Sequence, residues 1–270
     1  VYKRQGYLRL RGLIAPALAG AERILAQGRR DVRRFVRCGA TPERAERAGN
    51  LKFDIELSSS LLETGELLRA GWGVHRPVFV AGSTHEDDER VLFSAFRRLL
   101  ERHPHALLVL APRHPERFAR AAQDAAAAGL DVGLHSRSRL PGKANCLVLD
   151  TMGELLAYYA AADVAFVGGT IADVGGHNLL EPAALGKPLL FGPHTAHVKE
   201  TASRLLESGA ARRVLTAEDT WREVDHLFDH PATRDRMSQA GLRLVQQGRG
   251  ALAKTLAALD AIDRAQDQEE

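Results

Sequence analysis

From about residue 77 onward, short apolar runs alternate with longer amphipathic segments. The runs are four to six residues long, rich in Val, Leu and Phe, and bounded by Gly, Pro or polar residues, which predicts strands buried on both faces. Such strands are typical of a parallel sheet covered by helices. The predicted strands are Pro77–Ala81, Ala106–Ala111, Cys146–Leu149, Asp163–Val167, Pro188–Phe191 and Ala211–Leu215.

Between these runs, apolar residues recur at helical spacing. Strands that alternate with helices favour a doubly wound, Rossmann-like α/β fold over residues 77–230. The predicted helices are Glu86–Arg102, Pro115–Ala128, Gly153–Ala161, Leu179–Leu185, Val198–Ser208 and Glu218–His230.

The first 56 residues resemble the tail of a second α/β unit, with a helix over Tyr7–Ala19, a strand over Arg23–Ala26 and a helix over Arg29–Cys38. Residues 57–76 contain a helix but are rich in Gly and Ser, so we place an inter-domain linker there. Two units joined in this way predict a cleft between them.

The end of the chain, residues 231–270, has an Ala- and Leu-rich helical pattern and is predicted to form C-terminal helices. The chain begins with Val1 rather than Met, so we expect it to be a fragment. The expected organisation is a remnant of an N-terminal domain over 1–56, a linker, and a C-terminal α/β domain followed by helices.

Composition agrees with a globular protein. The chain has 270 residues, of which 45% are hydrophobic and 26% charged, enough for a sizeable core. Its two cysteines, Cys38 and Cys146, are far apart, which argues against a disulfide framework and favours a reducing cytoplasm. Apolar runs are too short to cross a bilayer and no secretory signal pattern opens the chain.

Charge is distributed unevenly. Residues 1–47 hold twelve Lys and Arg against four Asp and Glu, whereas the whole chain has a net charge of only +3. This basic segment favours an anionic lipid surface or a phosphorylated glycolipid as partner. A solvated helix face explains it equally well, and nucleic acid is disfavoured because few aromatics are interleaved. The arginines concerned are Arg29, Arg30, Arg33, Arg34 and Arg37.

Candidate chemistry lies in the loops that follow the strands, where ligands bind in open parallel sheets. After the first strand, Ser83 and Thr84 precede a predicted helix, so they either bind a phosphate or cap that helix. After the second, Arg113 and His114 stand between two prolines, and the arginine offers a fork suited to phosphate or carboxylate.

Two further loops combine capping patterns with possible binding groups. Thr151 and Glu154 have the spacing of a capping box, and the same helix start could read a nucleobase edge. Asn178 and Glu181 have the same spacing, and Glu181 could accept ribose hydroxyls. Glycine pairs precede Asn178, and a fifth loop, Gly192–Thr195, could close over a ligand.

Histidines occur in four of these loops. Because they stand on separate loops without close ligand spacing, the sequence predicts no metal site. The histidines are His85, His114, His177 and His194.

Several runs together resemble one family, the bacterial Kdo (3-deoxy-D-manno-octulosonic acid) transferases. The resemblance covers nearly the whole chain from about Gly6. Its most specific part is Gly175–Pro193 (GGHNLLEPAALGKPLLFGP), supported by AGSTHE, APRHPERF, DTMGEL and the upstream GNLKFD.

The resemblance implies a GT-B fold of two Rossmann-like domains, here N-terminally truncated, with the donor bound in the C-terminal one. It implies inverting transfer of Kdo from CMP-Kdo to a lipid A precursor (lipid IVA) in lipopolysaccharide biosynthesis, at the cytoplasmic face of the bacterial inner membrane. Neither metal nor cofactor is expected. The general base would lie in an N-terminal region that this chain lacks, so the chain alone is expected to be inactive.

The resemblance also assigns donor-binding roles. Ser83, Thr84, Arg113 and His114 would surround the CMP phosphate. Met152, Gly153 and Glu154 would line the cytidine, and Gly176, Asn178 and Glu181 would meet the ribose or the sugar.

Two other hypotheses remain open. A GT-B transferase or epimerase that uses a UDP-sugar would share the fold and the ribose carboxylate. A nucleotide-binding or lipid-docking module without activity would fit the basic segment.

Overall fold

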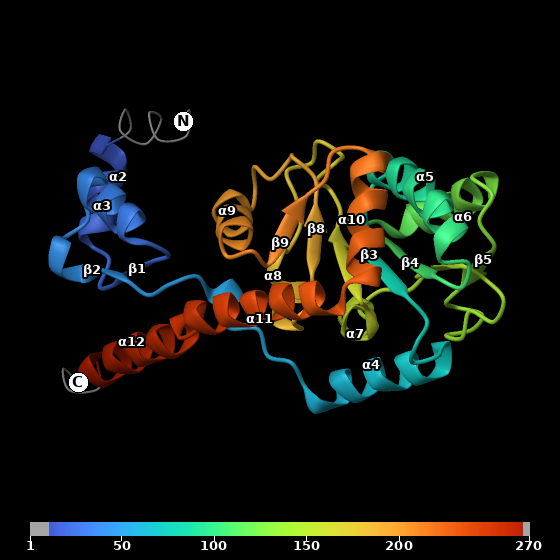
Figure 1. Ribbon diagram of the computed structural model, residues 1–270. Coiled ribbons are helices and arrows are strands. Elements are labelled where there is room, and N and C mark those ends of the chain that lie inside the picture. Colours follow the sequence, from blue (N-terminus) through green and yellow to red (C-terminus); the bar gives the residue numbers. More distant parts are fainter. Residues whose placement is uncertain (1–10, 267–270) are drawn as a thin grey trace. The chain divides into compact units, whose positions relative to one another are not determined.

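The computed structural model describes residues 11–266, which form two compact units (Figure 1). Of these residues, 11–55 and 245–266 make up the smaller unit and 56–244 the larger one. Within the described part of the chain, no helix is both long and apolar enough to cross a membrane.

The larger unit contains a seven-stranded sheet of order β5-β6-β4-β3-β7-β8-β9 in which every neighbouring pair is parallel. The six predicted strands are confirmed. The edge strand β5 was missed because it is three residues long and only half-buried. The strands are β3 Val78–Thr84, β4 Leu107–Pro112, β5 Val132–Leu134, β6 Cys146–Val148, β7 Val164–Val167, β8 Leu189–Phe191 and β9 Ala211–Arg213.

Helices cover both faces of this sheet (Figure 1), and the predicted α/β class is confirmed. The helices that follow the strands begin within two residues of their predicted positions, except that a 3₁₀ turn opens one of them. The elements are α4 Ser59–Trp72, α5 Glu86–Arg102, η3 Pro115–Arg117, α6 Phe118–Ala127, α7 Leu155–Ala161, α8 Leu180–Ala184, α9 Lys199–Glu207, α10 Ala217–Asp229 and α11 Pro231–Gly248.

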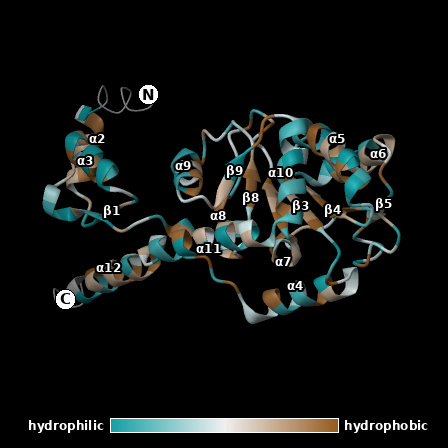
Figure 2. Ribbon diagram, viewed as in Figure 1, coloured by the Kyte–Doolittle hydropathy of each residue, from teal (hydrophilic) through white to brown (hydrophobic). Residues whose placement is uncertain are grey.

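The central strands are apolar on both faces because each face is covered (Figure 2). Phe79 and Ala81 of β3 belong to the core formed with α5, α6 and α10. Gly82, on the opposite face, abuts Tyr159 of α7, leaving no room for a side chain. On the α5 side, Arg98 stacks 3.9 Å above the Trp221 ring of α10. Burial of each large apolar side chain stabilises the fold by about 1.5–3 kcal/mol.

Most of the predicted linker, residues 57–76, is the regular helix α4, which packs against α7. Gly65 sits so close to α7 that a Cβ would lie 2.6 Å from the Cβ of Ala160. Arg69 pairs with Asp163 at 2.9 Å. The glycine therefore permits close helix packing rather than ending the helix.

The smaller unit has a two-stranded parallel sheet, β1-β2, and a small core of Ile24, Ala40 and Ala45. The predicted strand and helix after Arg23 are confirmed, β2 was not predicted, and residues 7–10 of the first predicted helix lie outside the described residues. The elements are α2 Arg11–Ala19, β1 Ile24–Ala26, α3 Arg29–Cys38, η1 Pro42–Arg44, β2 Ala45–Arg47, η2 Leu51–Phe53 and α12 Ala251–Gln266.

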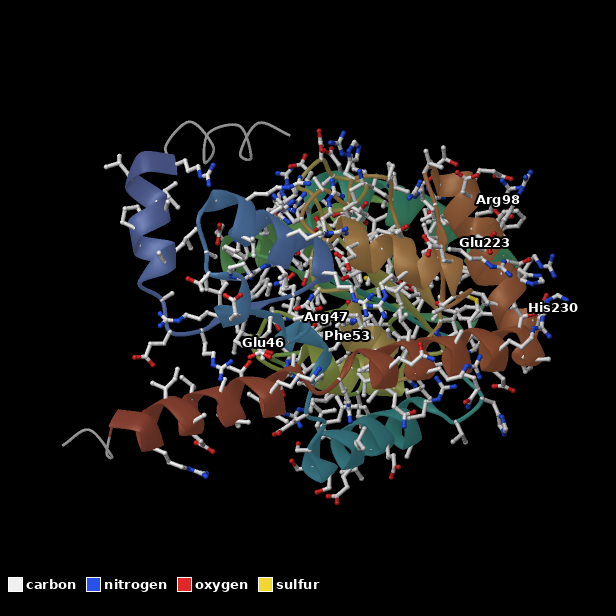
Figure 3. All side chains as sticks on the ribbon, turned by 90° about the vertical axis from the view of Figure 1, so that its left-hand side faces the viewer. Glu46, Arg47, Phe53, Arg98, Glu223 and His230 are labelled. Carbon is white, nitrogen blue, oxygen red and sulfur yellow. The ribbon has the colours of Figure 1, made fainter. Side chains whose placement is uncertain are left out.

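The helical pattern at the end of the chain is divided into α11 and α12 at Gly250, whose φ is +102°. Asp54 accepts hydrogen bonds from the backbone N–H groups of Gly250 at 2.7 Å and Leu252 at 2.8 Å. The neighbouring Phe53 (Figure 3) is 3% exposed and packs against Gly248. The start of α12 is therefore held by a segment about 200 residues away.

Candidate functional site

The order of the strands locates a crevice between β3 and β7. From β3 the chain continues to β4, its neighbour in one direction, and from β7 it continues to β8, its neighbour in the opposite direction. In α/β folds, ligands bind at the switch point where the strand order reverses in this way. At this point Gly168, after β7, donates to the carbonyl of Gly82 at 2.8 Å. A side chain on Gly168 would overlap the backbone of Ser83 and Thr84. The two loops are therefore in direct contact.

Asp88, in the first turn of α5, joins these loops. Its buried carboxylate accepts from the backbone N–H groups of Gly169 at 2.7 Å, Ile171 at 2.9 Å and Ala172 at 3.0 Å. It also accepts from the N–H of His85 at 2.9 Å. These amides form a nest that a carboxylate of the protein already fills.

The first turn of α5 is acidic throughout, from Glu86 to Glu89. These charges offset the positive end of the helix dipole, so this helix start does not offer a free anion site. Thr84 is 1% exposed and its hydroxyl donates to Glu89 at 3.0 Å. Of the two predicted phosphate-binding residues, Thr84 is thus buried and its hydroxyl is used in a hydrogen bond within the protein. Ser83, half-buried with a φ of +54°, remains at the edge of the sheet.

Glu89 is part of a buried ion pair that the sequence did not suggest. Arg117 of η3 donates to Glu89 at 2.6 Å and to Glu86 at 3.1 Å. Burial raises the pKa of Glu89, and the Arg117 guanidinium opposes that rise. The second arginine of the PRHPER run thus connects η3 to α5.

Basic residues from three strand-end loops converge at the switch point. His85 Nε2 lies 2.9 Å from His177 Nε2, with the two rings nearly parallel at 5°. The His114 ring meets the His85 ring edge-on, with centroids 5.5 Å apart. Arg113, exposed, has no hydrogen bond or ion pair from its guanidinium to any residue in 11–266, while its backbone N–H donates to Thr84 at 2.9 Å.

Partial burial and these neighbours favour the neutral forms of His85 and His177. Burial lowers the pKa of His177 to about 4, with the charges of His85 and Arg113 adding to the effect. Burial likewise lowers the pKa of His85, although the Asp88 carboxylate opposes the change. The result is a cluster in which Arg113 carries the fixed positive charge.

The loop after β6 differs from its prediction. Thr151 and Glu154 do not form a capping box, because α7 begins at Leu155 and the Thr151 hydroxyl donates to the Glu154 carboxylate at 2.8 Å. Glu154 also pairs with Arg139. Met152 is 59% exposed, and Gly153, with a φ of +90°, has open space where a side chain would stand. This loop therefore offers backbone and an apolar side chain, whereas Glu154 is already engaged.

The loop before α8 is also not a capping box, since its N-cap residue is Leu179. Asn178 instead accepts from the N–H of Leu180 at 3.1 Å and donates to Glu181 at 3.0 Å. Burial raises the pKa of Glu181, and the Asn178 hydrogen bond partly opposes this. Asn178 thus fixes the orientation of a half-buried carboxyl group.

The glycine loop is interlocked with the fifth loop, after β8. Gly176 has a φ of +87°, and a Cβ on it would lie 2.8 Å from Val198. The N–H of His197 donates to Gly175 at 2.9 Å, and His194 faces Asp173 at 3.0 Å. Gly176 thus shapes the loop and allows close approach.

Although they stand on separate loops, His85, His114 and His177 lie close together, because parallel strands end at one edge and bring their loops together. No signal within any one loop pointed to the pairing. The described residues that could surround a metal are instead His103, Asp225 and Asp229, at the opposite end of α5. Arg102 already pairs with both of these carboxylates.

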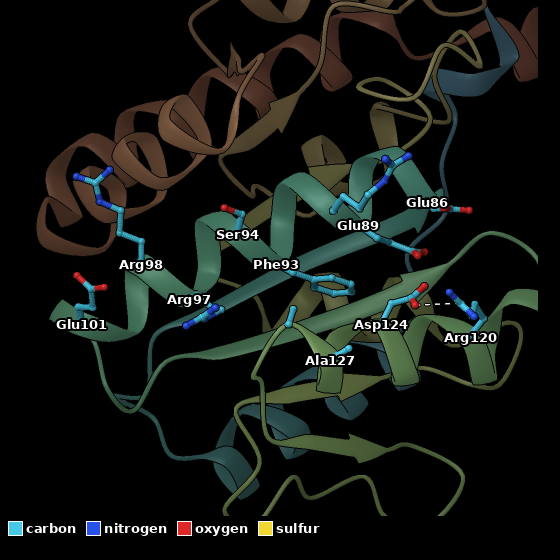
Figure 4. Close-up of a pocket in the computed structure, with 12 residues that line it drawn as sticks. Glu86, Glu89, Phe93, Ser94, Arg97, Arg98, Glu101, Arg120, Asp124 and Ala127 are labelled. Carbon is cyan, nitrogen blue, oxygen red and sulfur yellow. Dashed lines mark ion pairs between the residues drawn. The ribbon is translucent and has the colours of Figure 1, made fainter.

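A separate groove of about 620 Å³ lies between α5 and α6 (Figure 4). It is lined by charges of both signs, including Arg97, Glu101 and Asp124, around Phe93. None of the predicted donor-binding residues lines it, so its position argues against a part in the predicted site.

The fold of the larger unit, with a crevice at the switch point of its sheet, is that of a GT-B domain. The C-terminal CMP-Kdo binding domain of WaaA from Acinetobacter baumannii has the same fold, with a TM-score of 0.67 and 24% identity, covering 70% of this chain and all of that one. A putative UDP-N-acetylglucosamine 2-epimerase from Listeria monocytogenes is also similar, with a TM-score of 0.58 and 16% identity over 92% of this chain and 60% of that one.

Sequence comparison identifies the family. Residues 2–55 match the family described as 3-deoxy-D-manno-octulosonic-acid transferase (kdotransferase). The 3-deoxy-D-manno-octulosonic acid transferases of Bordetella pertussis and Haemophilus influenzae are 39% and 35% identical over 90% and 86% of this chain. The chain belongs to the Kdo transferase family. It spans about half the length of these relatives, 57% and 55% respectively.

Proposed function

We propose that this chain binds CMP-Kdo and serves an inverting transfer of Kdo to a lipid A precursor in lipopolysaccharide biosynthesis. The proposal rests on the position of Arg113 beside the histidines at the switch point of the sheet. Its guanidinium has no partner among the described residues. Family membership supplies the substrate class, because the curated relatives are named as Kdo transferases.

In this proposal, Arg113 and His114 face the phosphate of the leaving CMP, with Ser83 beside them. Positive charge placed where negative charge develops lowers the barrier to departure without a metal. Met152 and Gly153 line the cytidine through the open loop after β6.

The ribose or sugar would meet the carboxyl group of Glu181, which Asn178 orients, next to the backbone of Gly176. Glu154 can contact the cytidine only if donor binding changes the contacts of its carboxylate with Thr151 and Arg139. The general base is assigned to none of the residues of this chain.

The test is calorimetric titration of the 270-residue chain with CMP, UDP and GMP. We expect selective CMP binding that Arg113→Ala weakens about tenfold or more, since a charge-assisted hydrogen bond contributes about 1.5–3 kcal/mol. Arg243→Ala, at an exposed arginine of α11, is the matched control and should bind as the wild type does. Preference for UDP would instead indicate a UDP-sugar enzyme, and a folded chain that binds no nucleotide would refute the proposal.

The proposed location is the cytoplasmic face of the bacterial inner membrane, with α3 on the anionic lipid surface. All five arginines of this helix are exposed, and Arg34 alone among them pairs with a residue of the described chain, Asp31 at 2.7 Å. Each basic residue near such a surface contributes about 1 kcal/mol. Phosphate groups of a glycolipid acceptor would be attracted in the same way.

Vesicle co-sedimentation tests this location. The variant Arg30→Glu/Arg33→Glu should bind phosphatidylglycerol vesicles at least about tenfold more weakly than the wild type, because each reversal replaces attraction with repulsion. The control Arg137→Glu/Arg243→Glu changes net charge equally at exposed sites of the larger unit. Equal losses in both variants would show only a general charge effect and would contradict the assignment to α3.

A further inference from the structure

The rings of His85 and His177 are joined by a hydrogen bond. Their Nε2 atoms are 2.9 Å apart, so one ring must donate a proton and the other accept it. The bond connects the loop after β3 with the glycine loop after β7, on the two sides of the switch point. Both rings are half-buried, and each therefore retains an edge that solvent or a ligand can reach.

The titratable and charged groups around the pair come from three segments. From the loop after β4 come Arg113 and His114, and from η3 comes Arg117, whose charge is balanced by Glu86 and Glu89. From α5 comes Asp88, whose oxygens are occupied by backbone N–H groups.

In the free protein, burial and the Arg113 charge disfavour a second positive charge, and the pKa of His177 is lowered to about 4. A dianionic phosphate beside Arg113 would reverse this balance, because an opposite charge within about 4–6 Å favours the charged form of a base. One added proton is compatible with the geometry. An imidazolium can still donate its Nε2–H to the neutral partner, so the 2.9 Å contact survives.

We propose that the His85–His177 pair forms part of the phosphate-binding surface and takes up a proton from solvent when a phosphate monoester binds beside Arg113. The proton adds to an imidazole nitrogen lone pair, and no other bond changes. This inference deepens the proposed function and rests on it for the identity of the ligand as CMP. The pair would then supply positive charge only when a phosphate is present.

The first measurement is calorimetry with CMP at pH 7.5, where the phosphate is already mostly dianionic, in buffers of different ionisation enthalpy. The wild type should take up a substantial fraction of one proton per CMP bound. Cytidine, which lacks the phosphate, should cause no uptake. Between the free and bound pKa values of the pair, CMP affinity should rise by up to about tenfold for each unit that the pH falls.

His85→Gln and His177→Gln remove the titrating rings while keeping a polar side chain, and they should bind CMP with little or no proton uptake. His226→Gln is the matched control, because His226 is a half-buried histidine of α10 whose ring also stacks on a second histidine ring, away from the site. It should take up protons as the wild type does. CMP binding with equal uptake in wild type and His177→Gln would overturn the inference and leave the proposed function intact.

A second readout separates the two proposals further. The imidazole C–H signals of His177, followed by NMR from pH 4 to 9, should show a midpoint that rises by about three units, to about pH 7 or above, in the presence of CMP or inorganic phosphate. If inorganic phosphate raises the His177 midpoint but the chain does not bind CMP selectively, the role of the histidine pair in phosphate binding is supported and CMP as the ligand is contradicted. If neither ligand moves the midpoint, the pair does not bind phosphate.

Discussion

At the scale of residues, four consecutive acids at the start of α5 have different roles. Asp88 is bound by backbone amides, Glu89 is buried against Arg117, Glu86 shares that arginine, and Asp87 pairs with Arg90 on the surface. Their sequence, EDDE, looks like one solvated acidic turn. The tertiary partners decide which carboxylate holds the site together.

Asp88→Asn should destabilise the protein by about 2–4 kcal/mol. The substitution replaces one acceptor oxygen by an amino group that faces backbone N–H donors, so buried donors lose their partner. Urea unfolding at pH 7 measures the change. Asp87→Asn, at the exposed neighbouring position, is the control and should change stability by less than about 0.5 kcal/mol. Similar losses in both variants would contradict the role of the amide nest.

Gly176 and Gly153 provide a second comparison between residues. Both have positive φ, which costs an alanine about 1–2 kcal/mol, but only at Gly176 would the new Cβ meet another side chain, Val198. Gly176→Ala should therefore destabilise the protein by about 2–4 kcal/mol and Gly153→Ala by about 1–2 kcal/mol. Chemical denaturation of the two variants checks the order, and equal costs would show that the contact with Val198 relaxes freely.

At the scale of elements, helix starts are the features that local patterns described least well. Thr151 and Asn178 have the spacing of a capping box just before α7 and α8, yet neither forms one, although Asn178 accepts from the first N–H of α8. Thr216, by contrast, accepts from the N–H of Asp219 in a regular capping box at α10. In α7 and α8, both short, side-chain contacts within the preceding loop take the place of a capping box.

The start of α12 shows the opposite case, a helix stabilised from a distant segment. Asp54 accepts from Gly250 and Leu252, and these backbone hydrogen bonds lower its pKa. We expect Asp54→Ala to destabilise the smaller unit by about 0.5–2 kcal/mol at pH 7, the usual value of a cap. Hydrogen exchange of the α12 amides measures the effect, with Asp260→Ala on the exposed face as control.

The same contact should depend on pH with a defined sign. A carboxyl group whose pKa is lower in the folded state stabilises that state above its unfolded pKa, about 4, and the stabilisation is lost as the pH falls through the folded value. The difference between wild type and Asp54→Ala should therefore be present at pH 7 and vanish once the pH has fallen below the lowered pKa of Asp54. A difference that persists there would mean that the alanine acts through packing.

At the scale of the whole molecule, the two units differ greatly in their cores. The larger unit buries a continuous set of strand and helix side chains, whereas the cluster around the small sheet of the other unit has only three buried residues, Ile24, Ala40 and Ala45. Small cores stabilise little, so we expect unfolding in two steps with the smaller unit first.

Both tryptophans, Trp72 and Trp221, lie in the larger unit, which makes the two steps separable. In urea, the circular dichroism signal should begin to fall before tryptophan fluorescence changes. Phe53→Ala, which removes a buried ring of the smaller unit, should move only the early phase. Coincident transitions by both probes would show that the two units unfold together.

The sequence by itself determined the α/β class, six of the strands, the loops at the carboxyl edge and the family, because each depends on patterns within a few residues or on a contiguous motif such as GGHNLLEP. It also singled out Arg113 as a candidate phosphate ligand, since an arginine between two prolines has no evident structural role; that role stays a prediction. The short edge strand β5 was missed because three half-buried residues carry too little hydrophobic pattern.

Only the tertiary structure decided how the loops combine. His85 and His177 are 92 positions apart, and Asp88 and Gly169 are 81 apart, yet each pair is in hydrogen-bond contact. Parallel strands place the ends of distant segments at one edge, so pairings across that edge depend on strand order. The order β4-β3-β7 follows from packing of the whole sheet, and local sequence periodicity contains no record of it.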